Sequence, residues 1–488
     1  MIRYTKWAIW LYIILLFFEG ALRKWVFPGW SQPLLIVRDP VLLLIYGLAL
    51  MSGIVPRTKF MIFLSALALA SLCGSYLAGQ NNLWVTLFGL RSNYLHVPLI
   101  WVMAGALKRK DVEQIGSFIL IVVIPMIVLM VMQFRSPIGS WINRGVGDDD
   151  LGQIYGAAGH IRPPGLFTFI TGPMVFFPLA AAFFLYQVSM VRHGLWWWLL
   201  VLWPCGAGIV LAIPISISRG TMIATLLVFI VFLCCLIFGG VTHRLKRLPL
   251  KILGRLCLAF ILIGGCLAFT PLFKDAQEVF MDRWDTAAAE SEGDAVGSLI
   301  SRITSAFSQP IDTIERTPPF GYGIGVGTNV GARLLAGRTG FLLAEDEWGR
   351  VIMELGPLLG VAFIAFRICL TVFLGSIAFR AMRRDNDLLP MLIYSAAAWI
   401  IMMNQWGQAT QLGFAVAGGG LLLASVNRDD DEETEEEEDD ESEENADDDD
   451  DEVDEDDSEE EDPAEEETDA GAPEISPHAA RRRRLRGL

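Results

Sequence analysis

Histidine and cysteine are both rare in this sequence, with 5 and 7 of 488 residues. All seven cysteines lie inside apolar runs long enough to cross a bilayer, so we expect no disulfide in a loop outside the membrane. Only His160 falls in an expected external loop, and one histidine does not make a metal site. The sequence therefore predicts no disulfide framework, no bound metal and no cofactor.

The net charge of −17 conceals two regions of opposite sign. Residues 428–488 hold 33 of the 55 Asp and Glu residues but only 6 of the 38 Lys and Arg residues. The other 427 residues therefore carry 22 acids against 32 basic residues, a balance of +10. Segment 428–488 has no aromatic residue and too little apolar surface to fold, so we expect a disordered acidic tail in the cytoplasm.

Long apolar runs dominate the remainder of the chain, residues 1–427. A helix of about 20 apolar residues spans a bilayer. By this criterion the sequence predicts twelve spans, near 6–24, 33–53, 59–78, 86–107, 114–134, 166–187, 195–216, 219–240, 251–271, 351–378, 386–404 and 409–426. The expected fold class is an all-α polytopic membrane protein with about twelve transmembrane helices.

The distribution of Lys and Arg predicts the orientation of these helices. With the amino terminus in the cytoplasm, the cytoplasmic loops hold fifteen Lys and Arg residues and the short external loops hold six. Both ends of the chain are therefore expected inside, with long external loops at about 135–165 and about 272–350. The second loop lies between predicted helices 9 and 10. It contains two stretches with helical spacing, "DAQEVFMDRWDTA" and "VGSLISRITSAFSQPIDTI", and a Pro- and Gly-rich stretch, "RTPPFGYGIGVGTN".

Several arginines fall on the predicted outer side of the membrane: Arg38, Arg91, Arg162, Arg219, Arg302 and Arg350. A guanidinium group suits phosphate and pyrophosphate because its planar fork bonds two oxygens at once. Arg219, in "SISRGTM", begins a predicted helix, where unpaired backbone N–H groups also favour an anion. The alternative is that outward arginines reach for lipid headgroups. Arg367 is predicted in mid-span, so it must pair inside the protein or face a wet cavity.

Three consecutive acids, Glu345, Asp346 and Glu347, precede a predicted span in "LLAEDEWGRVIMELGPLLG". In one interpretation the acids stabilise the start of a helix, and Arg350 pairs with Glu354 one turn further along. In the other, one acid is a general base that takes a proton from a hydroxyl beside the arginines.

Three weaker signals favour ordinary structural roles. The "GYGIGVGTN" run follows no predicted strand, so we do not interpret it as a nucleotide-binding loop. Asp148–Asp150 is expected to be a solvated part of the first external loop. His96, in "RSNYLHVP", is expected to be a helix residue with its hydrogen bonds satisfied.

The order of four motifs, "SRG", "SRITSAF", "PPFGYGIGVG" and "ELGPLLG", resembles the O-antigen polymerase and O-antigen ligase superfamily of envelope polysaccharide assembly. The segment "IRPPGLFTFITGP" adds to the resemblance, which covers about 160–365. Members of this superfamily are polytopic helical enzymes with a large periplasmic loop. They transfer a glycan from a polyprenyl-pyrophosphate donor to an acceptor hydroxyl without a metal.

The resemblance implies roles for individual residues. Arg219 and Arg302 would hold the pyrophosphate. The family usually has His-Asn about nine residues before the Glu of its "E.G..G" motif, and here those positions are Glu345 and Asp346. The base would therefore be a carboxylate. Arg91, Arg162, Arg350 and Glu347 are the predicted substrate-binding residues.

The sequence thus favours a metal-independent inverting glycosyltransferase in the cytoplasmic membrane, acting as a polysaccharide polymerase or ligase. Its expected partners are a lipid-linked glycan donor, a glycan acceptor, membrane lipid and other polysaccharide-assembly proteins, but no nucleic acid. One alternative is a transporter or flippase for lipid-linked sugars, which would favour internal repeats and broken helices. Another is a metal-dependent glycosyltransferase with an acidic first external loop, but that loop, about 24–33, has no acid.

Overall fold

The computed structural model of the protein describes residues 1–54, 58–146, 159–191, 193–241, 264–265, 268–289, 295–337, 340 and 342–427. Contacts between Cα atoms divide the chain into two units, residues 1–427 and 428–488. Three predictions fall outside the described residues: the disordered acidic tail, the solvated Asp148–Asp150 segment and most of the span at 251–271.

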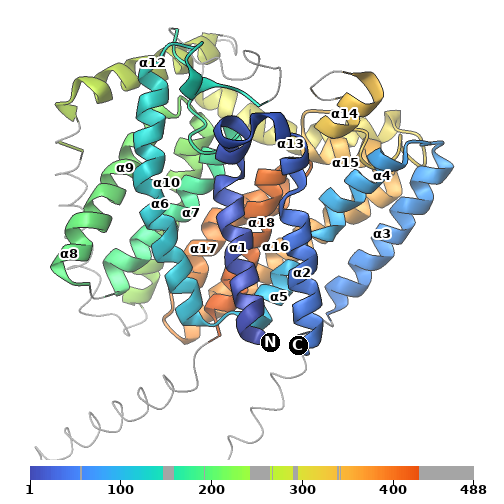
Figure 1. Ribbon diagram of the computed structural model, residues 1–488, viewed down its shortest axis with the longest axis horizontal. Coiled ribbons are helices and arrows are strands. Elements are labelled where there is room, and N and C mark those ends of the chain that lie inside the picture. The colour runs from blue at the N-terminus through green and yellow to red at the C-terminus, as the bar shows by residue number, and fades with distance from the viewer. Residues whose placement is uncertain are drawn as a thin grey trace, which may run out of the picture. The chain divides into compact units, whose positions relative to one another are not determined.

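Helices form the first unit, and its described residues contain no strand (Figure 1). Eight helical segments are long and apolar enough to cross a membrane: Ile2–Val26 (α1, Ile2–Ala21, with the π-helix η1), Pro33–Met51 (with α2, Arg38–Met51), α3 (Lys59–Leu77), α6 (Arg109–Arg135), α7 (Thr171–Met190), Leu195–Ile215 (with α9, Trp203–Ile215), α10 (Arg219–Val241) and α16 (Pro357–Arg384). Large apolar side chains on α3 face outward, among them Ile62 and Leu69, which are 73% and 64% exposed. The protein is an all-helical, multi-pass membrane protein.

The other four predicted spans do not meet the same criterion among the described residues. Helices α17 (Leu389–Met403) and α18 (Ala409–Ser425) are apolar but shorter. The predicted span 86–107 is interrupted: α4 (Leu83–Leu90) continues into a π-helix, η4 (Arg91–Leu95), and α5 (Leu99–Ala106) begins only after Pro98. Proline interrupts the helix because it has no N–H and its ring clashes with the preceding turn.

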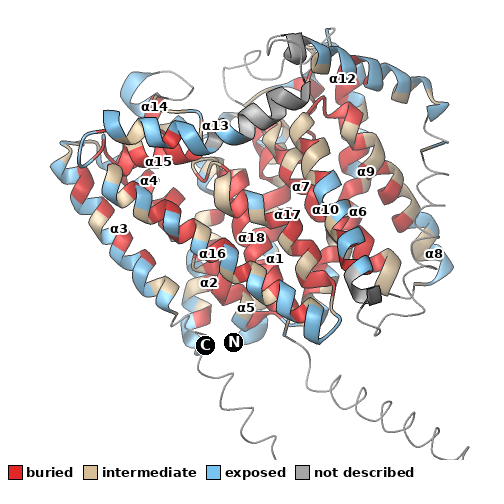
Figure 2. Ribbon diagram, turned by 180° about the vertical axis from the view of Figure 1, so that it is seen from behind, coloured by how far each residue is buried: buried red, intermediate tan, exposed pale blue. Residues whose placement is uncertain are grey.

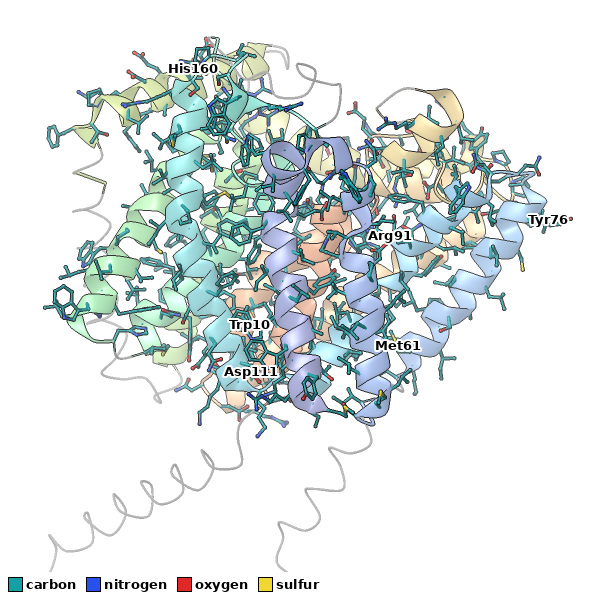
Figure 3. The ribbon with its side chains drawn as sticks, viewed as in Figure 1. Trp10, Met61, Tyr76, Arg91, Asp111 and His160 are labelled. Atoms are coloured by element: carbon teal, nitrogen blue, oxygen red, sulfur yellow. The ribbon has the colours of Figure 1, made fainter. Side chains whose placement is uncertain are left out.

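Both ends of the first unit lie at the same end of the helix bundle. Lys6 pairs with Asp111 near the start of α6, and the backbone N–H of Arg109 donates to the carbonyl of Asn427 over 2.9 Å. Figure 3 labels Asp111 at this terminal end and His160 at the opposite one. The opposite end, termed the loop end, also carries helices α12 to α15 (Figure 1). That the loop end faces the outside of the cell stays a prediction.

Helix α18 lies at the centre of the packing and is buried along most of its length (Figure 2). It contacts α5, α7 and α17. Three consecutive glycines allow this close packing: a Cβ on Gly418 would lie 2.6 Å from the Cβ of Ala397, and one on Gly420 2.6 Å from the sulfur of Met103. Small residues serve the same purpose at helix interfaces in membranes generally.

The loop end is largely helical, and the helical spacing predicted there is confirmed. Helices α12 (Pro271–Ala289) and α13 (Ala295–Arg316) are followed by α14 (Asn329–Ala336) and α15 (Glu347–Leu355). The Pro- and Gly-rich stretch is a loop, as predicted, and it docks on the end of α15. There the N–H groups of Tyr322 and Gly323 donate to the carbonyls of Met353 and Glu354 over 2.8 and 3.0 Å. Both N–H groups are therefore used in hydrogen bonds that hold the loop on α15.

Candidate functional site

The buried face of α15 carries a cluster of ionised side chains. The guanidinium of Arg350 donates to both oxygens of Glu347, over 2.8 and 3.0 Å, and to Glu354 over 2.7 Å. The predicted pairing of Arg350 with Glu354 is confirmed. Arg367, in α16, donates from Nη1 to Oε1 of Glu347 over 2.6 Å. Glu347, the third acid of the run Glu345–Glu347, is therefore the partner that Arg367 needs within α16.

This cluster connects four parts of the chain. Arg350 also donates to the side-chain oxygen of Asn93 in η4 over 3.1 Å, and Glu354 accepts from the N–H of Gly327 over 2.8 Å. Arg367 donates to the carbonyls of Ile401 and Asn404 over 2.8 and 2.7 Å. The cluster thus fixes α15 against α16, η4, the Gly-rich loop and the turn between α17 and α18.

Glu347 is held in its ionised form. Its side chain is buried, and burial alone would raise its pKa, but Arg350, Arg367 and the N–H of Trp406 together lower the pKa below its ordinary value. A base needs a carboxylate that gains a proton easily near the working pH. The side chains of Glu347 and Arg350 are buried in this cluster. Both residues therefore hold α15 in position. Their predicted contact with substrate stays a prediction.

A pocket of about 190 Å³ lies beside this cluster. Glu345, Asp346 and Trp348 line it from the start of α15, and Trp399, Asn404 and Gln405 line it from α17 and the turn that follows. The cluster holds both walls, because Glu347 belongs to the first and Arg367 binds the carbonyl of Asn404 in the second.

The two remaining acids of the run differ in their surroundings. Asp346 is the N-cap of α15, where its carboxylate accepts from the N–H of Gly349 over 2.6 Å, as the helix-start interpretation expects. Glu345 is exposed, and no hydrogen bond or ion pair from the described residues engages its carboxylate. Only its carbonyl is bound, by the side-chain amide of Gln405. Of the two, Glu345 has the carboxylate available to a ligand.

Glutamine side chains brace the pocket wall. Gln408 donates to Gln405 over 2.6 Å, and Gln411 donates to Gln408 over 2.7 Å. The oxygen of Gln408 also accepts from the hydroxyl of Thr171, the first residue of α7, over 3.1 Å. This ladder of amides links the pocket to the loop end of α7.

Three arginines gather beside the same part of α7. Burial, together with the positive charges of Arg283 and Arg219, lowers the pKa of Arg162 to about 10. The guanidinium of Arg219 lies over the ring of Trp284, 5.6 Å from its centre. These residues come from the loop before α7, the start of α10 and the middle of α12. Arg302 is in α13, but its side chain lies outside the described residues.

The first turn of α7 contacts both the amide ladder beside the pocket and the start of α10. Thr171 reaches the amide ladder, whereas Met174 packs against the start of α10, where a Cβ on Gly220 would lie 2.7 Å from its sulfur. Residues three apart in an α-helix are separated by only about 4.5 Å along the axis. The first turn of α7 therefore connects the amide ladder beside the pocket to the start of α10, where Arg219 lies.

Arg91 and Arg38 belong to a different group. Arg91, labelled in Figure 3, donates to both oxygens of Asp39, and His96 contacts Asp39 over 3.1 Å. The chain of contacts continues from His96 to Tyr12 over 2.9 Å and from Tyr12 to Arg38. The hydrogen bonds predicted for His96 are confirmed, but the residue lies in the break between η4 and α5 and not in a helix. Arg91 is bound to a carboxylate in the interior, apart from the arginines around α7, and its predicted contact with substrate stays a prediction.

Sequence reasoning missed several residues of this region. It did not single out Arg283, nor the pocket residues Trp399, Asn404, Gln405 and Gln411. One signal was present: "NQWGQATQ", residues 404–411, places four amide side chains between two apolar helices. Polar side chains are costly inside a membrane, so a cluster of amides at the ends of two apolar helices indicates a candidate site.

Comparison with known proteins gives no further guide, because no family model matches the chain and no curated protein matches it. Within the described residues, no group of three or more His, Cys, Asp and Glu side chains is arranged to hold a metal ion.

Proposed function

We propose that the protein transfers a glycan from a polyprenyl-pyrophosphate donor to a hydroxyl of an acceptor sugar, at the outer face of the cytoplasmic membrane. It would act as a polysaccharide polymerase or ligase. One observation carries the proposal: at the loop end, the first turn of α7 connects the amide ladder beside a pocket with an exposed carboxylate to a group of arginines. The motif order that resembles the O-antigen polymerase and ligase superfamily supports it.

The arginines would stabilise the leaving group. Arg162, Arg219 and Arg283 lie close enough for each of the other two to depress the pKa of Arg162, so the group attracts anions. Pyrophosphate gains negative charge as its bond to the sugar breaks, and cations placed beforehand stabilise that charge most in the transition state. In the apo protein the same charges repel one another.

Glu345 would act as the general base. The acceptor hydroxyl gives its proton to the carboxylate while its oxygen forms a bond to the anomeric carbon. The bond from that carbon to the pyrophosphate breaks, and the electron pair leaves with the pyrophosphate, so the configuration inverts. Asp346 cannot serve equally, since its carboxylate is already committed to the N–H of Gly349.

A transporter for lipid-linked sugars is the second candidate, and one observation favours it. The segment α4–η4–α5 is interrupted, and Arg91 in the interruption is bound to Asp39 inside the bundle. Interrupted helices with charged groups near mid-membrane are typical of secondary transporters. The pocket and arginines at the loop end have no evident part in such a cycle.

The test is polymerisation of a lipid-linked repeat unit by the purified protein in liposomes, read as product ladders. Glu345→Gln keeps the size of the side chain but removes its proton affinity, so turnover should fall by on the order of 10²–10⁴. Asp346→Asn is the companion variant, because Asn caps a helix about as well as Asp, so turnover should fall much less than in Glu345→Gln. Near-normal ladders from Glu345→Gln would rule out this carboxylate as the base.

The same liposomes separate the two candidates. A transporter would move a fluorescent lipid-linked sugar between leaflets without lengthening it. Leaflet exchange without a polymer, unaffected by Glu345→Gln, would favour transport over glycosyl transfer.

A further inference from the structure

One buried polar group of the pocket has no hydrogen-bond partner among the described residues. Asn404 lines the pocket and is only 7% exposed, yet its side-chain nitrogen has no hydrogen-bond partner among the described residues. A buried donor without an acceptor is costly, and such groups in folded proteins usually have a partner. An oxygen of a bound ligand would provide it.

The rest of the lining suits a ligand with one apolar face and many hydroxyl groups. Trp399 is 41% exposed and offers a flat aromatic surface, on which the C–H face of a sugar ring can lie. Gln405 and Gln411 are held in place by the amide ladder, so their positions are fixed before a ligand arrives. A pocket of about 190 Å³ accommodates a single sugar ring.

The charge of the pocket decides which sugar fits. Glu347 is balanced by Arg350 and Arg367, but no Lys or Arg from the described part of the chain lines the pocket to balance Glu345 or Asp346. Carboxylates repel an acidic ligand at short range, most strongly where water is partly excluded. An anionic sugar is disfavoured here, and so is the pyrophosphate of the donor.

We infer that this pocket is the acceptor subsite and that it selects a neutral or amino-bearing sugar over an acidic one. Asn404 and Trp399 bind the sugar ring. The negative charge of Glu345 excludes acidic sugars. The inference rests on the proposed function and assigns the donor and the acceptor to separate subsites. The donor's pyrophosphate binds the arginines around α7, and the sugar that supplies the attacking hydroxyl binds between α15 and α17.

The test measures sugar binding without turnover. The purified protein in lipid nanodiscs is titrated with three probes, methyl glucoside, methyl glucosaminide and methyl glucuronide, and binding is followed by saturation-transfer NMR. The neutral and amino sugars should bind, and the glucuronide should bind at least about tenfold more weakly. Glu345→Gln removes one repelling charge and should narrow that preference. Equal binding of all three probes would overturn the inference.

Two variants locate the binding. Trp399→Ala changes a partly exposed side chain and should weaken binding of methyl glucoside about tenfold. Asn404→Ala should weaken it by about fivefold to tenfold, the effect of one lost hydrogen bond. Trp196→Ala is the control, because Trp196 is 75% exposed on α8 (Leu195–Trp197), outside the pocket. Unchanged binding in Trp399→Ala would place the acceptor elsewhere, even if Asn404→Ala failed to fold.

These outcomes are independent of the test of the proposed function. Polymerisation that depends on Glu345, together with sugar binding that ignores Trp399, would keep the proposed function and reject the subsite. Sugar binding that depends on Trp399, in a protein that neither lengthens the repeat unit nor transfers it to an acceptor, would keep the sugar-binding pocket and reject the transferase.

Discussion

Nη1 of Arg367 lies 2.6 Å from Oε1 of Glu347, and both side chains are sealed from solvent. This contact joins α16 to the start of α15 across the turn at Gly356. It explains why a run of three acids precedes an apolar helix. Glu347 anchors the helix in the interior, Asp346 caps it, and Glu345 faces the pocket.

Replacing Glu347 should destabilise the protein strongly. Glu347→Ala leaves the guanidiniums of Arg350 and Arg367 buried with one partner fewer, and removing one member of a buried pair costs about 3–5 kcal/mol. The melting temperature of the detergent-purified variant measures this loss. Glu278→Ala, which changes an exposed acid on α12, is the control. Equal melting temperatures for both variants would mean that the buried cluster contributes little to stability.

Acid should remove the stabilisation that Glu347 provides. Its pKa in the folded protein lies below the ordinary value of 4.5. The stabilisation is therefore fully present above that value and is lost as the pH falls through the folded-state pKa. The difference in melting temperature between wild type and Glu347→Gln should be constant from pH 7 to about pH 5 and should shrink below pH 4.5. A difference that does not vary with pH would contradict an ionised Glu347.

The sequence predicts features that depend on neighbouring residues in the chain. The helices at 271–289 and 295–316, the cap by Asp346 and the pair of Arg350 with Glu354 follow from helical spacing and from the chemistry of helix ends. Each rests on residues within one or two turns of one another.

Contacts between distant segments could not be predicted in this way. Arg367 had no nameable partner, because Glu347 lies 20 residues away beyond the turn at Gly356. Glu345 and the pocket wall from Trp399 to Gln411 are about 60 residues apart in the sequence. The fold brings them together, and the side chain of Gln405 bonds to the carbonyl of Glu345. The span at 86–107 is not confirmed as one continuous helix, since apolar composition alone does not reveal the break before α5.

The Gly-rich loop should tolerate no side chain at Gly325. This residue has φ of 90°, and a Cβ on it would lie 2.2 Å from the carbonyl oxygen of Val85 in α4. Gly325→Ala should therefore lower the free energy of unfolding by at least about 1–2 kcal/mol from the backbone conformation alone, with the clash in addition. Gly29→Ala is the control, because nothing lies within 4 Å of the position that a Cβ on Gly29 would take. Similar melting temperatures for both variants would show that the loop can move away from α4.

Neutralising Arg162 should stabilise the protein without ligand. Burial and the charges of Arg283 and Arg219 lower its pKa to about 10, so Arg162 is still charged at neutral pH, but its charged form is less stable in the folded state than in the unfolded state. Arg162→Gln should raise the melting temperature by on the order of a few degrees. Inorganic pyrophosphate should raise it more in the wild type than in the variant. Equal shifts with pyrophosphate in both proteins would indicate that Arg162 does not bind this anion.

The form of the cation at Arg219 should matter as much as its charge. Arg219→Lys keeps a positive charge at the start of α10 but loses the planar fork that bonds two phosphate oxygens and lies over the ring of Trp284. We therefore expect Arg219→Lys to be nearly as damaging as Arg219→Ala in the polymerisation assay. Both variants should also lose most of the thermal shift that inorganic pyrophosphate gives the wild type. Arg3→Lys, at the exposed start of α1 and the terminal end, should have normal activity and a normal shift. Full activity in Arg219→Lys would show that the residue acts as a point charge, and the bidentate arrangement around the leaving group would have to be abandoned.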